Sequence, residues 1–154
     1  MSDSPLAALL QTLQEQLQAF RQLLEREQSC LTTWPVVGLQ EITHEKQRQA
    51  HTLQQLDTQC RRLLSDAGLL RMTPAQRQQS LAAQAIWQQW QQTRELMTRC
   101  RNLNEGNGAR LQALSQHTLR LLDCMGAGAT SPSITYGRAG QYQIGGRRSA
   151  IGRA

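Results

Sequence analysis

Leucine recurs at alternating spacings of four and three residues through the first part of the chain, and this restricts the fold more than any other feature. The alternation is the heptad pattern of a helix with one narrow apolar stripe, which needs other helices to cover it. Ser4 and Pro5 favour a helix start, and Pro35 disfavours helix in the residue before it. We therefore predict a helix over residues 5–33. Its stripe comprises Leu6, Leu10, Leu13, Leu17, Phe20, Leu24 and Leu31, with Glu27 in the one polar slot.

A second stripe with the same alternation predicts a helix over residues 37–67. Lys46 and Gln49 are polar members of this stripe, and a polar residue at such a position lowers stability but restricts register and partner choice. Gly68 is placed to end the helix in the left-handed conformation. The stripe comprises Leu39, Ile42, Lys46, Gln49, Leu53, Leu56, Cys60, Leu63, Ala67 and Leu70.

A third helix is predicted over residues 74–124. Thr73, Pro74 and Gln76 form the pattern of a capping box, in which side chains and backbone amides satisfy each other at a helix start. The third stripe comprises Ile86, Trp90, Met97, Cys100, Leu111, Leu114, Leu121 and Met125, with Thr93, Asn104, Asn107 and Thr118 in its polar slots.

The segment Glu105-Gly106-Asn107-Gly108 interrupts the third stripe. We assign a structural role to Asn104, Gly106, Asn107 and Gly108. Two glycines so close together lower helix propensity by roughly 2 kcal/mol relative to alanine. The helix therefore kinks here, breaks here, or lets another backbone approach closely.

Composition agrees with helices. The 154 residues include 24 Gln and 23 Leu but only six aromatic residues, and straight-chain residues favour helices whereas sheets need β-branched and aromatic ones. We predict an all-α fold in which three long antiparallel helices form a coiled-coil-like bundle over residues 1–125. Residues 126–154 contain seven Gly, four Arg and no acidic residue, which predicts a flexible C-terminal tail.

The sequence contains no pattern typical of an active site. Glu41 and His44 form one Glu-x-x-His motif, but a di-iron bundle needs two such motifs and two further glutamates. The four cysteines match no zinc spacing, and we expect small, buried, reduced side chains. No apolar run is long enough for a membrane span. We expect a cytoplasmic protein without membrane insertion that is not an enzyme and holds no metal or cofactor.

Two segments could bind an amphipathic partner helix. The amphipathic segment after the glycines could pack on the bundle or leave it, and we predict the binding site there. Trp87 and Trp90, one helical turn apart, are the alternative: they either pack in the core or form the wall of a groove. The predicted site comprises Leu111, Leu114, Thr118, Leu121 and Leu122.

The tail raises the question of nucleic-acid binding, because arginine provides charge and tyrosine provides a stacking surface. Its arginines are sparse, however, and the rest of the chain is nearly neutral, which favours a solvated tail or a protein-docking peptide. These residues are Arg138, Arg147, Arg148 and Arg153, with Tyr136 and Tyr142.

Two short segments, in the same order, carry a family resemblance. The segment 103–108, Leu-Asn-Glu-Gly-Asn-Gly, resembles the Leu-Asn-x-x-Asn-Gly segment of the FlgN family of flagellar export chaperones. The segment 135–141, Thr-Tyr-Gly-Arg-Ala-Gly-Gln, resembles that family's tail motif, commonly Leu-Tyr-Gly-x-x-Gly-x. Thr135 stands where leucine is common, which removes an apolar contact beside Tyr136.

The resemblance implies a chaperone of type III flagellar export. Such a protein binds the C-terminal amphipathic segments of the hook–filament junction proteins FlgK and FlgL and delivers them to the export gate protein FlhA. Ile134, Tyr136 and Gly137 would then dock the tail on the gate. Two other functions stay open at this point: a structural coiled-coil adaptor of another assembly, and a nucleic-acid binder that acts through its tail.

Overall fold

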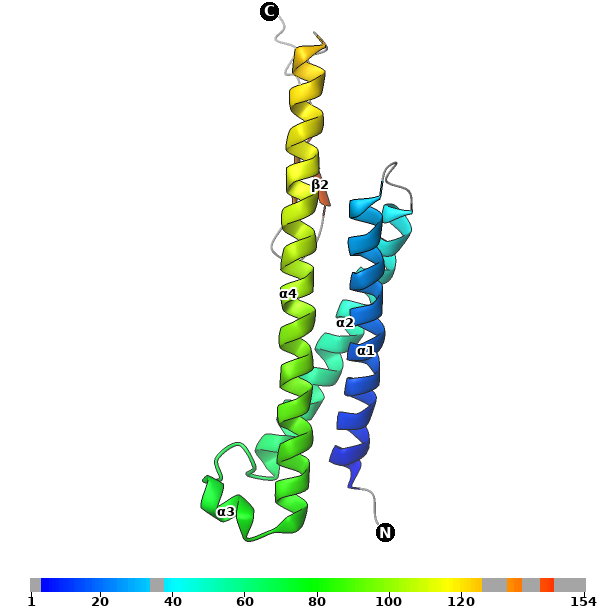
Figure 1. Ribbon diagram of the computed structural model, residues 1–154. Helices are drawn as coiled ribbons and strands as arrows, with labels where there is room; N and C mark the ends of the chain where they lie inside the picture. The colour runs from blue at the N-terminus through cyan, green and yellow to red at the C-terminus, as the bar shows by residue number, and fades with distance from the viewer. Residues whose placement is uncertain (1–3, 34–37, 126–132, 137–141, 146–154) are drawn as a thin grey trace, which may run out of the picture. The chain divides into compact units, whose positions relative to one another are not determined.

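The computed structural model describes residues 4–33, 38–125, 133–136 and 142–145, and four helices account for most of them (Figure 1). The chain divides into two compact units, residues 1–103 and 104–154. The first unit contains α1 (Pro5–Thr32), α2 (Leu39–Asp66), α3 (Pro74–Gln78) and the first half of α4 (Leu81–Cys124). The second contains the rest of α4 and two short strands. The helical architecture confirms the predicted fold class.

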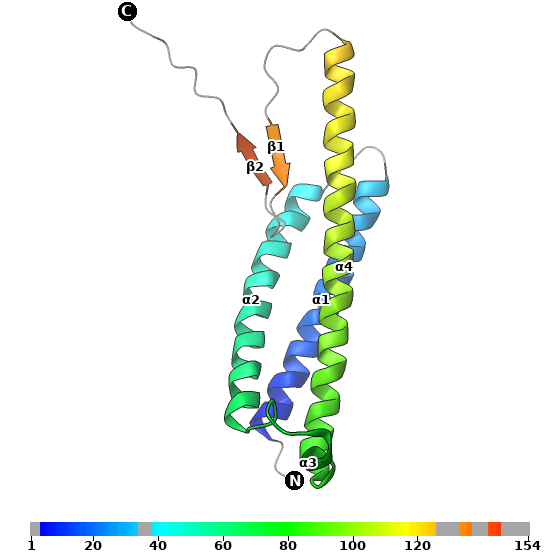
Figure 2. The same cartoon turned by 90° about the vertical axis from the view of Figure 1, so that its left-hand side faces the viewer.

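Helix α1 runs antiparallel to α2, and the two lie side by side (Figure 2). All seven apolar residues of the predicted α1 stripe are buried, and so is Glu27 in the polar slot. Leu23 is also buried, although it lies outside the stripe. The reason is that α1 contacts both α2 and α4, so its apolar face must be wider than a two-helix seam.

Contacts between α1 and α4 within the first unit are partly polar. The Gln14 side-chain amide donates to the backbone carbonyl of Gln89 at 3.1 Å and to the hydroxyl of Thr93 at 3.0 Å. The Gln89 side chain in turn donates to the carbonyl of Ala7 at 3.3 Å. The Cys100 thiol lies 3.5 Å from the carbonyl of Leu17. These contacts fix the position of the first half of α4 along the axis of α1.

The apolar core of the first unit draws on α1, α2, the turn after α2 and the first half of α4. Its largest fully buried side chain is Trp90, which is 2% exposed. The buried members are Leu6, Leu10, Leu13, Leu17, Phe20, Leu23, Leu24, Ile42, Cys60, Leu64, Leu69, Trp90 and Cys100.

Helix α2 ends as predicted at a left-handed glycine, because Gly68 has φ +69°. The amide of Leu69 donates to the carbonyl of Leu64 at 3.0 Å, and that of Gly68 to Ser65 at 2.9 Å, which together make a Schellman motif. This turn corrects the end of the predicted second stripe. Ala67 and Leu70 are exposed, whereas Leu64 and Leu69 are buried.

The predicted helix over residues 74–124 is two helices in the structure, so the count of three long helices is corrected to three long helices and one short one. Helix α3 begins at the predicted capping box, which Thr73 and Gln76 form. It ends at Gln78 because Ser80 starts a new helix. The Ser80 hydroxyl accepts the amide of Ala83 at 3.3 Å, as an N-cap does.

Helix α4 is continuous from Leu81 to Cys124 and passes through both glycines of the interrupted segment. The predicted alternative in which the helix breaks at these glycines is therefore wrong. A Cβ on Gly106 would lie 3.3 Å from the Arg110 guanidinium, which is the end of a flexible side chain. The glycines thus cost helix propensity without ending the helix.

Two strands follow in the second unit, β1 (Ser133–Tyr136) and β2 (Tyr142–Gly145). They pair antiparallel, with Ile134 opposite Ile144 and Tyr136 opposite Tyr142. The sequence patterns did not predict them, because each strand has only four residues. The rest of the predicted flexible tail lies outside the described residues.

Candidate functional site

The predicted partner-binding residues lie on the last third of α4, in the second unit. Their spacing of three and four residues along one continuous helix places them on one side of it. Leu111 and Leu114 are half-buried, and Thr118 is exposed. The Thr118 hydroxyl donates to the carbonyl of Leu114 at 3.0 Å, so it adds little polarity to the stripe.

Large apolar side chains become exposed toward the end of α4. Leu122 is 37% exposed, Leu121 is 51% exposed and Met125 is 75% exposed. Isolated exposed leucines are common on soluble proteins, but three large apolar residues within five positions form a patch. This patch, Leu121–Leu122–Met125, is named the terminal α4 patch below.

The alternative site at the two tryptophans is less accessible. Trp90 is 2% exposed, and the Arg61 guanidinium lies over its ring, 5.3 Å from the centroid. Trp87 is half-buried, and the Arg77 guanidinium covers its ring at 4.0 Å. Trp90 therefore packs in the core, and each ring already has a cationic partner.

The four predicted structural residues all lie inside α4. Asn107 is buried at 1% exposure, whereas Asn104, Gly106 and Gly108 are half-buried. The boundary between the two compact units falls immediately before Asn104. These residues thus mark a change of unit within one unbroken helix.

The predicted gate-docking residues are divided between described and undescribed parts of the chain. Ile134 and Tyr136 belong to β1, and Gly137 lies outside the described residues. The backbone of Tyr136 pairs with that of Tyr142. The pairing brings the two tyrosines of the chain opposite each other in one hairpin.

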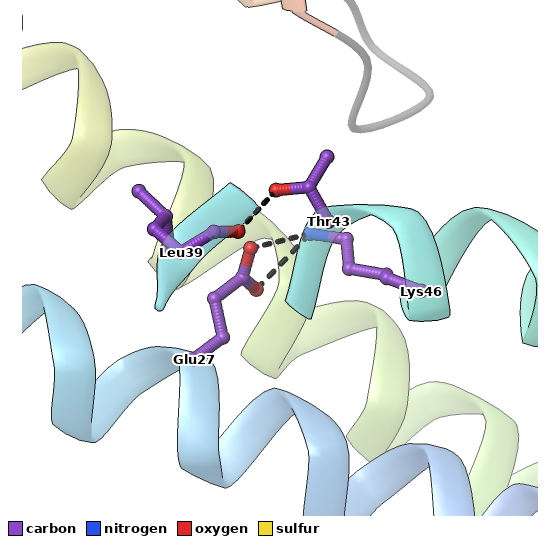
Figure 3. A network of polar contacts seen from close by, with 4 residues as sticks. All are labelled: Glu27, Leu39, Thr43 and Lys46. Atoms are coloured by element: carbon purple, nitrogen blue, oxygen red, sulfur yellow. Dashed lines mark hydrogen bonds and ion pairs between the residues drawn. The ribbon is translucent and has the colours of Figure 1, made fainter. Parts of the chain in front are cut away.

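The main polar feature of the first unit is an ion pair in the interior (Figure 3). The Lys46 ammonium on α2 donates to both carboxylate oxygens of Glu27 on α1, at 2.9 and 3.0 Å. Glu27 is 1% exposed and Lys46 is 4% exposed. Beside the pair, the Thr43 hydroxyl donates to the carbonyl of Leu39 at 2.8 Å. The heptad pattern of α1 contains Glu27 and that of α2 contains Lys46. Neither pattern could show that the two side chains lie opposite each other.

Two of the four cysteines are buried, in agreement with the prediction, and the other two are not. Burial, with a smaller contribution from the nearby Asp57 carboxylate, raises the pKa of the Cys60 thiol to about 11. Burial also raises the pKa of Cys100. Cys30 is half-buried, and Cys124 is exposed. The prediction of a buried side chain is therefore wrong for Cys124, which lies in the last turn of α4.

The residues that could have held a metal are dispersed. Glu41 and His44 are both exposed on α2. Within the described ranges, no three His, Cys, Asp or Glu residues are grouped so that they could bind a metal ion. No helix in the described part of the chain is long and apolar enough to cross a membrane.

Comparison with known proteins identifies the family. The model of the FlgN protein family matches residues 1–144, which is nearly the whole chain. Neither a curated protein nor a solved structure matches the chain. The family match includes both segments that carry the sequence resemblance, around Asn104 and around Tyr136. The chain therefore belongs to the FlgN family of flagellar export chaperones.

Proposed function

We propose that this chaperone acts in the cytoplasm, binds the C-terminal amphipathic segments of the junction proteins FlgK and FlgL, and delivers them to the export gate protein FlhA. Membership of the FlgN family supports the general role. The observation that supports a client site on this chain is the terminal α4 patch, in which Leu121, Leu122 and Met125 are exposed.

The chemistry of the patch suits a helical client. An amphipathic client segment has an apolar stripe that would self-associate if it stayed uncovered, and a second helix with exposed leucines can cover it. Leu111 and Leu114 extend the patch toward the N-terminus of α4. The client would thus be held along Leu111, Leu114, Thr118, Leu121 and Leu122.

The grooves of the first unit suit such a client less well. The groove between α1 and α4 has a volume of about 330 Å³ and is lined mainly by glutamine and charged side chains, among them Gln14, Gln18 and Gln92. The groove between α1 and α2 contains the apolar side chains of Cys30 and Ile42, but charged side chains, among them Glu25, Glu41 and Glu45, also line it. Seating an apolar stripe on such walls would bury polar groups without partners, which is unfavourable.

For delivery, we assign the contact with FlhA to the tail. Tyr136 combines an apolar ring with a polar hydroxyl, which suits a protein interface. Ile134 would add a smaller apolar contact, and Gly137 would let the backbone approach the gate closely. Because these residues lie outside the helices, the chain could bind client and gate together.

The client site is tested by a double variant, Leu121→Asp with Leu122→Asp. Both side chains are exposed, so the fold should persist while the apolar contact is lost. We expect calorimetry with purified FlgK or FlgL to show affinity reduced at least tenfold, as for interface residues that contribute most of the binding energy. The matched control is Leu81→Asp, an 85% exposed leucine in the first turn of α4, which should bind the client with parental affinity. Parental affinity in a helical double variant would place the client site elsewhere.

A further inference from the structure

The buried pair Glu27–Lys46 has no part in the proposed client or gate contacts. A buried ion pair is seldom more stabilising than apolar residues of similar volume, because both ions lose their hydration. Leucine in both positions would complete the α1 stripe and leave Gln49 as the one polar member of the α2 stripe. The presence of charges there therefore calls for a role other than stability.

Lysine itself is unusual in this chain. Among 17 basic residues, Lys46 is the only lysine and the other 16 are arginines. An ammonium is compact, whereas a guanidinium is wide and planar. The chain thus carries its one compact cation at a 4% exposed seam position, where its ammonium reaches both oxygens of Glu27 (Figure 3).

The heptad pattern leaves the register between α1 and α2 open. Two antiparallel stripes that repeat every seven residues can slide by one heptad and still match apolar to apolar. In one direction, such a slide would set Glu27 opposite Leu39 and Lys46 opposite Phe20. In the other, it would set Glu27 opposite Leu53 and carry Lys46 beyond Thr32, the last residue of α1. Either slide leaves a carboxylate against leucine, which is strongly unfavourable.

We propose that Glu27 and Lys46 form a register lock, which admits one pairing of α1 with α2 and rejects the pairings displaced by a heptad. The lock concerns the chain's own fold and goes beyond the proposed function. Such a lock suits a protein that exposes apolar helix surface for its partners, because the stripes of α1 and α2 then pair only with each other and in one register.

The test compares two double variants in the full-length chain. Glu27→Leu with Lys46→Leu removes the lock and leaves two stripes without charged residues. Glu27→Lys with Lys46→Glu reverses the pair and keeps the lock. Spin labels are introduced at the exposed positions Gln16 on α1 and Gln47 on α2 through unnatural side chains, so that the native cysteines stay unlabelled. The distance between the labels is then measured by electron paramagnetic resonance.

For the parent and the reversed pair, we expect one distance. For the leucine pair, we expect a second population whose label distance differs by up to about 10 Å, because seven helical residues span that length. Sedimentation should show additional assemblies for the leucine pair alone. One unchanged distance and one unchanged species in the leucine pair would overturn the lock.

If the reversed pair fails to fold by circular dichroism, Glu27→Gln with Lys46→Gln replaces it. Two amides keep a polar pair at the seam, so this variant should also give a single distance. A second population in a folded glutamine pair would show that polarity at these positions does not set the register. No client is present in any of these measurements, so their outcome is independent of the client site.

Discussion

Glu27 and Lys46 are the charged side chains of a largely apolar seam, and each depends on its partner for stability. Removing one member of a buried pair leaves the other charge in a poorly solvated place, which commonly costs about 3–5 kcal/mol. We therefore expect Glu27→Ala to lower the free energy of unfolding by about that amount in urea titrations. Glu25→Ala is the control, because Glu25 pairs with Arg21 at 3.4 Å on the surface, where such a pair contributes about 0–1 kcal/mol. Equal losses in the two variants would contradict a special cost of burial at Glu27.

Cys60 gives a pH dependence at the same scale. Its pKa is about 11 in the folded chain, against an ordinary value of 9.0. The unfolded thiol therefore loses its proton first as the pH rises, and deprotonation favours the unfolded state. The contribution of Cys60 to the free energy of unfolding is fully present below pH 9. It is lost as the pH rises toward 11, by about 2–3 kcal/mol in all.

This contribution is isolated by comparison with Cys60→Ala. Urea unfolding at intervals between pH 8 and 11 should show the parent losing more stability than the variant over that range. A parallel fall of both curves would mean that Cys60 does not contribute to the pH dependence. Iodoacetamide should meanwhile modify the exposed Cys124 much faster than Cys60 in the folded chain.

At the scale of the helix, two glycines with different surroundings should respond in opposite directions to the same substitution. Gly68 ends α2 at φ +69°, where a side chain costs roughly 1–2 kcal/mol. Gly106 lies inside α4, where alanine is favoured over glycine by about 0.5–1 kcal/mol. We expect Gly68→Ala to lower the melting temperature and Gly106→Ala to raise it.

The sign at Gly106 depends on the Arg110 side chain. A new Cβ would lie 3.3 Å from its guanidinium, so that flexible chain must move by a few tenths of an ångström. Calorimetric melting of the two single variants shows directly whether each substitution raises or lowers the melting temperature. A lower melting temperature for Gly106→Ala would show that Arg110 is held in place and that the glycine is required there.

Helix ends and stripes could be predicted from the sequence because they depend on local chemistry. Gly68 and the Thr73 capping box act within a few residues, and the α1 stripe repeats along one helix. The start of α4 at Ser80 was missed because glutamine and alanine continue the helical composition on both sides of it. The burial of Leu23 was missed because it depends on a second packing partner, which a single stripe does not encode.

For the candidate site, too, only the features that depend on local spacing could be predicted from the sequence. Spacing was sufficient to place Leu114, Thr118 and Leu121 on one side of a helix. Their exposure was not predictable, because it depends on what else packs there. The pairing of Glu27 with Lys46 likewise requires the register between two helices, and a heptad repeat is the same in every register.

For the molecule as a whole, the distribution of the core predicts which parts of the chain can be separated. Among the residues whose burial the structure describes, every buried member of the apolar core lies in the first unit, between Leu6 and Cys100. A chain that ends at Met125 keeps all of that core and the terminal α4 patch, and it lacks β1 and β2. We therefore expect this truncated chain to keep the parental melting temperature and the parental affinity for FlgK and FlgL.

The same truncation should abolish binding to FlhA, because it removes Ile134, Tyr136 and Gly137. Tyr136→Ala in the full-length chain is the matched point variant. It should weaken gate binding at least tenfold, the usual effect of truncating an aromatic anchor, and it should leave client binding unchanged. Tyr142→Ala is its control, because Tyr142 pairs with Tyr136 across the hairpin. If both tyrosine variants lose gate binding equally, the hairpin as a whole is required. If the truncated chain still binds FlhA with parental affinity, the helices themselves make the contact and the tail is dispensable for delivery.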